Sequence, residues 1–171
     1  SYAKGFRFGG INGDKLALED AIFQTDVEIP FTFGSDEIDN WELGLRTSWL
    51  DGRLTADATL FFIDWKNLQV LQRAGVFAFT DNVGGAEVKG VEFAFNALLT
   101  DNWSVALNAS YQDAKTSEDF QSGEFGFVPS GTALPNSPKW TGAAQLRYQR
   151  PVGSTTFDGS ATFAYRDSSI N

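Results

Sequence analysis

Cysteine, histidine and methionine are all absent from the 171 residues. Without cysteine, the chain has no disulfide framework and no thiolate chemistry. Without histidine, zinc sites of the usual kind and Ser-His-Asp catalysis are excluded. Because an initiator methionine is missing, we expect a processed chain or a piece of a longer one.

Basic residues are scarce, with 13 Lys and Arg against 22 Asp and Glu and a net charge of −9. This balance removes the usual electrostatic route to nucleic acid, and no run of basic residues forms a polybasic patch for anionic lipid. Long apolar runs are missing too, since none approaches the ~18 residues of a membrane helix, and no signal peptide opens the chain. Apolar residues still make up 42%, which argues against disorder.

Apolar and polar residues alternate with a period of two, which is typical of β-strands with two different faces. The pattern predicts an all-β, antiparallel fold with seven strands, near residues 1–8, 39–50, 53–66, 86–99, 103–114, 138–150 and 155–167. Only Leu16 to Phe23 is compatible with a short helix. Tight turns near 51–52, 100–102 and 151–154 alternate with long connections at 9–38, 67–85 and 115–137. This alternation is the layout of an outer-membrane β-barrel.

Aromatic residues make up 15% of the chain and recur eight residues apart on the apolar side of four strands. Eight residues span ~26 Å along a strand. With a tilt of about 40° this gives ~20 Å of height, close to the ~25 Å apolar band of a barrel. We interpret the aromatics as two girdles, with chance spacing as the alternative: Trp41 and Trp49, Trp103 and Tyr111, Trp140 and Tyr148, Phe157 and Tyr165.

The tight turns fix a register for three hairpins. It places Trp49 opposite Leu54, Trp41 opposite Phe62, Phe95 opposite Leu107, Val91 opposite Tyr111, and Tyr148 opposite Phe157. On the polar side it places Arg46 opposite Asp57 and Arg147 opposite Asp158. Each pair is either a cross-strand ion pair of ~0.2–1 kcal/mol or part of a charged wall that docks something inside a barrel. The sequence leaves both open.

Several segments together resemble the barrel of TonB-dependent outer-membrane receptors. They are Ser1–Arg7 with Gly9 and Gly10, Asn40–Leu45, Trp49–Leu54, Asn82–Ala86, Lys89–Glu92 and Leu134–Trp140. The resemblance implies a barrel of about 22 strands with a plugged lumen in the bacterial outer membrane. It also implies uptake of a scarce small-molecule ligand such as an iron-siderophore, cobalamin or a sugar, energised through TonB.

The chain departs from this family in extent, because it shows no plug domain, no TonB box and no closing strand. We therefore expect residues 1–171 to be about seven strands of a larger up-and-down transmembrane barrel, which reaches the TonB complex through a plug outside this chain. Two alternatives are a soluble all-β ligand-binding module and a passive porin or autotransporter barrel. No nucleophile has a base beside it, so the sequence predicts neither an enzyme nor a cofactor.

Candidate site residues fall into two groups. The expected lumen wall, with its candidate plug contacts, is Arg46, Asp57, Glu92, Arg147 and Asp158. The expected ligand loops carry Phe77, Phe79, Phe125 and Phe127, which either stack on a ligand or pack the loops together. Arg7 is expected in the lumen near the outer end, pairing with an anionic metal chelate or within the protein. Residues 9–40 hold eight carboxylates against Lys15, which either bind calcium or a cationic ligand or are simply solvated.

Overall fold

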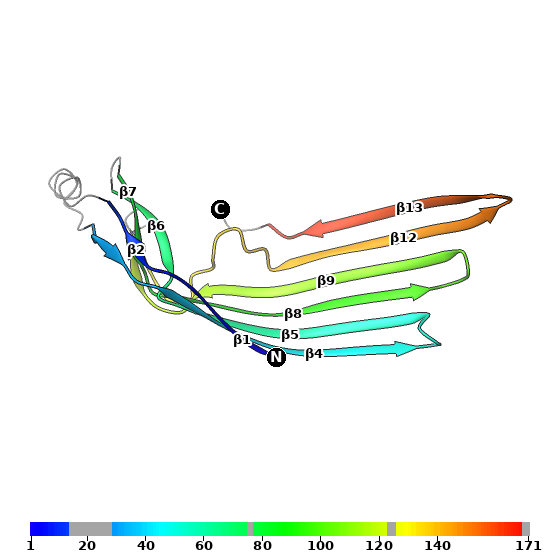
Figure 1. The fold of residues 1–171 in the computed structure, drawn as a ribbon, viewed down its shortest axis with the longest axis horizontal. Coiled ribbons are helices and arrows are strands. Elements are labelled where there is room, and N and C mark those ends of the chain that lie inside the picture. Colours follow the sequence, from blue (N-terminus) through cyan, green and yellow to red (C-terminus); the bar gives the residue numbers. More distant parts are fainter. Residues whose placement is uncertain (14–28, 75–76, 123–125, 169–171) are drawn as a thin grey trace.

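The computed structural model describes residues 1–13, 29–74, 77–122 and 126–168. Seven long strands form one sheet in the order β1-β4-β5-β8-β9-β12-β13, and every neighbouring pair is antiparallel. The sheet is long and curved, with tight turns at one end and short hairpins gathered at the other (Figure 1). The strands are β1 Tyr2–Arg7, β4 Asp36–Trp49, β5 Leu54–Lys66, β8 Gly85–Leu98, β9 Trp103–Thr116, β12 Trp140–Val152 and β13 Thr155–Arg166.

All seven predicted strands are confirmed, with small shifts at their ends. The register of two hairpins is confirmed as well. In the β4–β5 hairpin Arg46 lies opposite Asp57 and Trp49 opposite Leu54, and in the β8–β9 hairpin Phe95 lies opposite Leu107. In the turn after β8, the Thr100 hydroxyl accepts hydrogen bonds from the backbone N–H groups of residues 102 and 103, which holds the turn closed.

The predicted register of the β12–β13 hairpin is wrong by two residues. Pro151 and Val152 belong to β12, and the turn is formed by Gly153 and Ser154 alone. Gly153 has φ 63°, the left-handed conformation that two-residue hairpins require. Proline cannot donate a backbone hydrogen bond and is therefore rare inside central strands. Pro151 is tolerated because it lies beyond the last residue pair between β9 and β12, where no N–H from β12 is needed. Tyr148 therefore lies opposite Gly159 instead of Phe157.

The sheet has one apolar and one polar face, and neither is covered over most of its length. Residues on the face of Trp41 include Leu43, 72% exposed, and Phe163, 69% exposed. Buried apolar side chains among the described residues are few and small or lie near the loops: Ile29, Phe79, Val83, Ala86, Ala97 and Ala114. The sheet is thus a single layer, and its exposed apolar face requires an apolar environment to cover it.

The three long connections contain short hairpins that the sequence did not predict. They are β2 Gly10–Ile11 with β3 Thr32–Phe33, β6 Gln69–Ala74 with β7 Phe77–Asn82, and β10 Phe120–Ser122 with β11 Gly126–Val128. The β6–β7 hairpin continues β5 and β8 after a bend, because Asn67 and Gly84 have φ values of 52° and 44°. No helix in the described ranges is long and apolar enough to cross a membrane. The predicted helix from Leu16 to Phe23 lies outside those ranges.

Candidate functional site

The polar face of the sheet carries three of the five predicted wall residues around one shallow depression. Arg46 Nε donates to Asp57 Oδ1 at 2.5 Å across the β4–β5 pair. Glu92 stands one strand further along, opposite Thr59 on β5 and Ser110 on β9. These side chains line a depression of about 420 Å³. Both charged ends of the ion pair stay accessible, since the Arg46 side chain is 84% exposed and that of Asp57 is 32% exposed.

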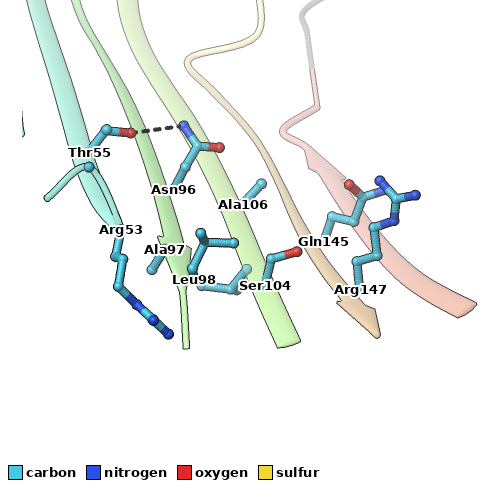
Figure 2. A pocket seen from close by; sticks show the side chains of 11 residues that line it. Arg53, Thr55, Asn96, Ala97, Leu98, Ser104, Ala106, Gln145 and Arg147 are labelled. Atoms are coloured by element: carbon cyan, nitrogen blue, oxygen red, sulfur yellow. Dashed lines mark hydrogen bonds between the residues drawn. The ribbon is translucent and has the colours of Figure 1, made fainter. Parts of the chain in front are cut away.

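The second predicted ion pair also forms, but on a diagonal. Arg147 lies directly opposite Ser160, and its Nη2 contacts Asp158 Oδ2 at 2.6 Å, two residues nearer the turn. A shift of two residues keeps every side chain on its face, so the pair survives the register error. Arg147 also lines a smaller depression of about 140 Å³ near the tight turns, where Asn96 donates to Thr55 at 3.5 Å (Figure 2).

A buried carboxylate, Asp36, organises the base of the loops. Its side chain is 1% exposed and is hydrogen-bonded on several sides. Arg7 contacts it through Nε and Nη2, Trp65 Nε1 donates at 2.9 Å, and the Gln69 backbone N–H donates at 3.3 Å. The Arg7 guanidinium also lies 5.0 Å from the Trp65 ring. Arg7 therefore forms its ion pair within the protein and not with an anionic metal chelate, which was the other alternative for this residue.

Burial of Asp36 raises its pKa, but the hydrogen bonds from Arg7, Gln69 and Trp65 favour the charged form more strongly. The net effect lowers the pKa of this carboxyl to about 2. Asp36 is thus ionised at any physiological pH.

Side-chain amides join the first two loops. Asn12 Nδ2 donates to Thr80 O and the Thr80 N–H donates to Asn12 Oδ1, both at 2.7 Å, so this amide imitates a strand pair. The Gly34 N–H donates to Asn82 Oδ1 at 2.5 Å, and Gln69 Nε2 donates to Gly34 O at 2.9 Å. None of these residues is predictable from the sequence, because contacts between distant loops leave no periodic signal.

The predicted loop aromatics differ in how far they are exposed. Phe79 is 4% exposed and packs inside its loop, which favours the packing alternative at this position. Phe127 is 63% exposed on β11. Phe77 begins β7, and Phe125 lies outside the described residues. Five carboxylates of the acidic stretch, Asp14, Glu19, Asp20, Asp26 and Glu28, also lie outside them. In the ranges that are described, no group of three acidic side chains is arranged to hold a metal.

The eight predicted girdle aromatics form two rows on the apolar face. Near the tight turns, Tyr148 contacts Trp103 and Phe157, with ring centroids 4.8 and 6.1 Å apart. Near the loops, Tyr111 and Trp140 have centroids 4.8 Å apart. The rows contain, respectively, Trp49, Trp103, Tyr148 and Phe157, and Trp41, Tyr111, Trp140 and Tyr165.

The two rows run parallel across the sheet. Successive cross-strand pairs from β4 through β5 and β8 lead from Trp41 to Asp113 on β9. Tyr111 therefore lies two residues nearer the turns than the position that corresponds to Trp41. Trp49 is level with Val105, so Trp103 also lies two residues nearer the turns. Both rows thus step by the same amount between β4 and β9, as expected when tilted strands cross a band of constant thickness.

Four features together define a wall segment of an outer-membrane β-barrel. They are an apolar outward band between aromatic rows, a polar inner face, tight turns at one end and large loops at the other. The family model described as "TonB dependent receptor-like, beta-barrel" matches residues 1–171. The chain belongs to this family, whose members are proteins of the Gram-negative outer membrane.

Relatives and solved structures agree with this placement. The probable TonB-dependent siderophore receptor PiuA of Acinetobacter baumannii is 26% identical over 119 residues, which cover 67% of this chain and 16% of PiuA. The crystal structure of PiuA gives a TM-score of 0.63 at 22% identity, covering 95% of this chain and 23% of PiuA. The ferric yersiniabactin uptake receptor FyuA of Yersinia pestis gives 0.62 at 16% identity, covering 95% and 25%. The alcaligin receptor FauA of Bordetella pertussis gives 0.53 at 17% identity, covering 97% and 26%.

The chain therefore spans about a sixth of its curated relative and about a quarter of the solved receptors.

Proposed function

We propose that this chain is a wall segment of a TonB-dependent receptor that takes up an iron-siderophore across the outer membrane. Family membership over the full 171 residues carries the proposal. The named relatives and structural neighbours, which are siderophore receptors, support this ligand class. Family membership also favours this function over the soluble module and the passive barrel.

The parts of the segment have separate tasks in this proposal. The aromatic rows and the apolar band between them contact lipid. The loop base around Asp36 holds the first two loops as one unit at the ligand entrance, because Arg7, Gln69 and Asn12 tie them together. The accessible charges of Arg46, Asp57, Glu92, Arg147 and Asp158 face the lumen, where they contact a plug outside this chain.

Uptake of iron-55 by cells producing the whole receptor tests the transport proposal. Ferric complexes of hydroxamate, catecholate and phenolate chelators are offered under iron limitation. We expect accumulation of at least one complex, lost when either the receptor or TonB is deleted. Accumulation that persists without TonB would indicate a passive barrel, and failure of every complex would remove iron-siderophores as the ligand class.

The lumen contact has its own test, in a whole receptor from which any cysteine outside these 171 residues has first been replaced. Glu92→Cys in the whole receptor, labelled with a short photo-activatable cross-linker, is expected to form a product with a peptide outside residues 1–171. Leu107→Cys is the matched control, since it lies on the opposite face and is 39% exposed. Equal cross-linking from both positions would contradict the assigned faces.

A further inference from the structure

The first two loops are joined by a reciprocal pair of side-chain amides, which we call the amide clasp. Asn12 of the first loop donates through Nδ2 to Thr80 O of the second and accepts from the Thr80 N–H, both at 2.7 Å. Asn82 of the second loop accepts from the Gly34 N–H at 2.5 Å and donates to Gly34 O at 3.1 Å. Each loop therefore supplies one amide that takes the place of a strand partner for the other loop.

Asn12 makes further contacts inside its own loop. Its Nδ2 has two hydrogens, and the one that does not reach Thr80 is donated to Pro30 O at 2.7 Å. Its backbone N–H donates to Phe31 O at 2.9 Å. Because one planar amide meets three backbone groups, its orientation is fixed. Asn12 therefore sets the angle between the two loops as well as the distance between them.

Apolar side chains flank the clasp. Ile29, Phe79 and Val83 are only 4 to 5% exposed, and each is a chain neighbour of a residue that the clasp joins. Away from water a hydrogen bond is stronger, and a polar group that loses its partner costs more. The two residues of the clasp do not titrate, in contrast to the Asp36 carboxylate at the loop base. The clasp is therefore a strong joint that does not respond to pH.

Asn12 holds the β6–β7 hairpin at a point away from its base. Gln69 and Asn82 form the first residue pair of this hairpin, next to the bend at Gly84. Contacts at that level hold the base, but they leave the direction of the hairpin open. Thr80 lies two residues further from the bend. The bonds of Asn12 to Thr80 are thus a second point of attachment, which fixes the direction of the hairpin.

We propose that Asn12 is a positioning residue for ligand uptake, because it holds the β6–β7 hairpin and the first loop together as a single entrance surface. The inference rests on the proposed function, which places these loops at the ligand entrance. Without the clasp, the hairpin occupies several arrangements about its bend. A ligand that fits one arrangement then binds more weakly, in proportion to the fraction of receptors that hold it. Asn12 acts in this way on affinity and not on the later steps of transport.

Asn12→Asp tests the clasp with little change in side-chain size. The carboxylate still accepts from the Thr80 N–H, but its second oxygen faces two carbonyl oxygens to which Nδ2 donated. Asn12→Ala is a second variant, which removes the bonds without adding charge. Gln121→Glu is the charge-matched control, because Gln121 is exposed on β10 in the third loop and is not part of the clasp. An unchanged melting temperature of the whole receptor verifies that all three variants fold.

Distances between spin labels report on the joint directly and need no ligand. The labels are attached at Ile11→Cys in the first loop and Leu71→Cys in the second, where the native side chains are 67 and 65% exposed. The purified whole receptor is used, with any other cysteine replaced. We expect a narrow distance distribution in the parent and in Gln121→Glu, and one about twice as wide in both Asn12 variants. Equal widths in all of them would overturn the inference.

The concentration dependence of iron-55 uptake separates positioning from a general loss of structure. The hydroxamate, catecholate and phenolate complexes are offered at increasing concentrations. For a complex that is accumulated, Asn12→Asp is expected to raise the half-saturating concentration about tenfold at an unchanged maximal rate, as when a tenth of the receptors hold the binding arrangement. A lower maximal rate at an unchanged half-saturating concentration would overturn the assignment to ligand entry. If no complex is accumulated, the proposed function fails, while the distance measurement still decides whether Asn12 fixes the two loops.

Discussion

Asp36 is the residue on which the loop base depends most. It is nearly inaccessible and is held by Arg7, Trp65 and Gln69, which come from β1, β5 and β6. Its pKa of about 2 lies below the ordinary value of 3.8. A depressed pKa means that the stabilisation is complete above the unfolded-state value and is lost as pH falls through the folded-state value.

We therefore expect the loop base to lose about 2 kcal/mol between pH 4 and pH 2. Hydrogen exchange of the β6–β7 amides in the detergent-solubilised receptor measures this loss. Asp36→Asn should abolish the pH dependence and raise exchange at pH 7. Asp158→Asn, in an exposed pair at the turn end, is the control and should leave β6–β7 exchange unchanged. An acid response that survives Asp36→Asn would assign the effect to another carboxylate.

At the level of strands and turns, Gly84 is the glycine whose conformation matters most. It bends the chain between β7 and β8 with φ 44°, and an added Cβ would lie 3.2 Å from the Phe120 ring. Gly84→Ala is expected to destabilise this junction by about 1–2 kcal/mol. Proteolysis between β6 and β7 should accelerate correspondingly. Gly44→Ala is the control, because Gly44 has no such φ and its nearest neighbour would be Thr59 Oγ1 at 3.6 Å. Equal sensitivity of both variants would show that strain at Gly84 is not the cause.

The strand pattern could be predicted where turns are short, and not where loops are long. Arg46 was placed opposite Asp57 because the turn between them admits one register. The β12–β13 pairs were misplaced because Pro151 resembles a turn residue, yet the faces stayed correct because the error was two residues. The Arg7–Asp36 contact could not be predicted, since more than twenty residues separate β1 from β4 and fix no register.

At the scale of the whole molecule, a sheet with two uncovered faces needs two different surroundings. The outward face presents Leu43, Leu60 and Phe93 to its surroundings, with exposures of 72, 56 and 42%. The inward face presents Thr, Ser, Asn and paired charges. In water, an apolar area of this extent would drive association. In a barrel, lipid covers it, and the polar face lines a wet lumen.

Leu107 and Asn108 decide between these surroundings because they are neighbours on opposite faces of β9. Leu107 lies between Phe95 and Ala144, midway between the aromatic rows, whereas Asn108 lines the depression beside Glu92. In lipid, Leu107→Arg should cost about 2–4 kcal/mol, since the charge enters the hydrocarbon band, while Asn108→Arg should cost little. Unfolding of the reconstituted whole receptor in guanidinium chloride measures both. Similar costs at the two positions would show that the apolar face of the sheet does not face lipid, because an arginine at position 107 would then remain in water.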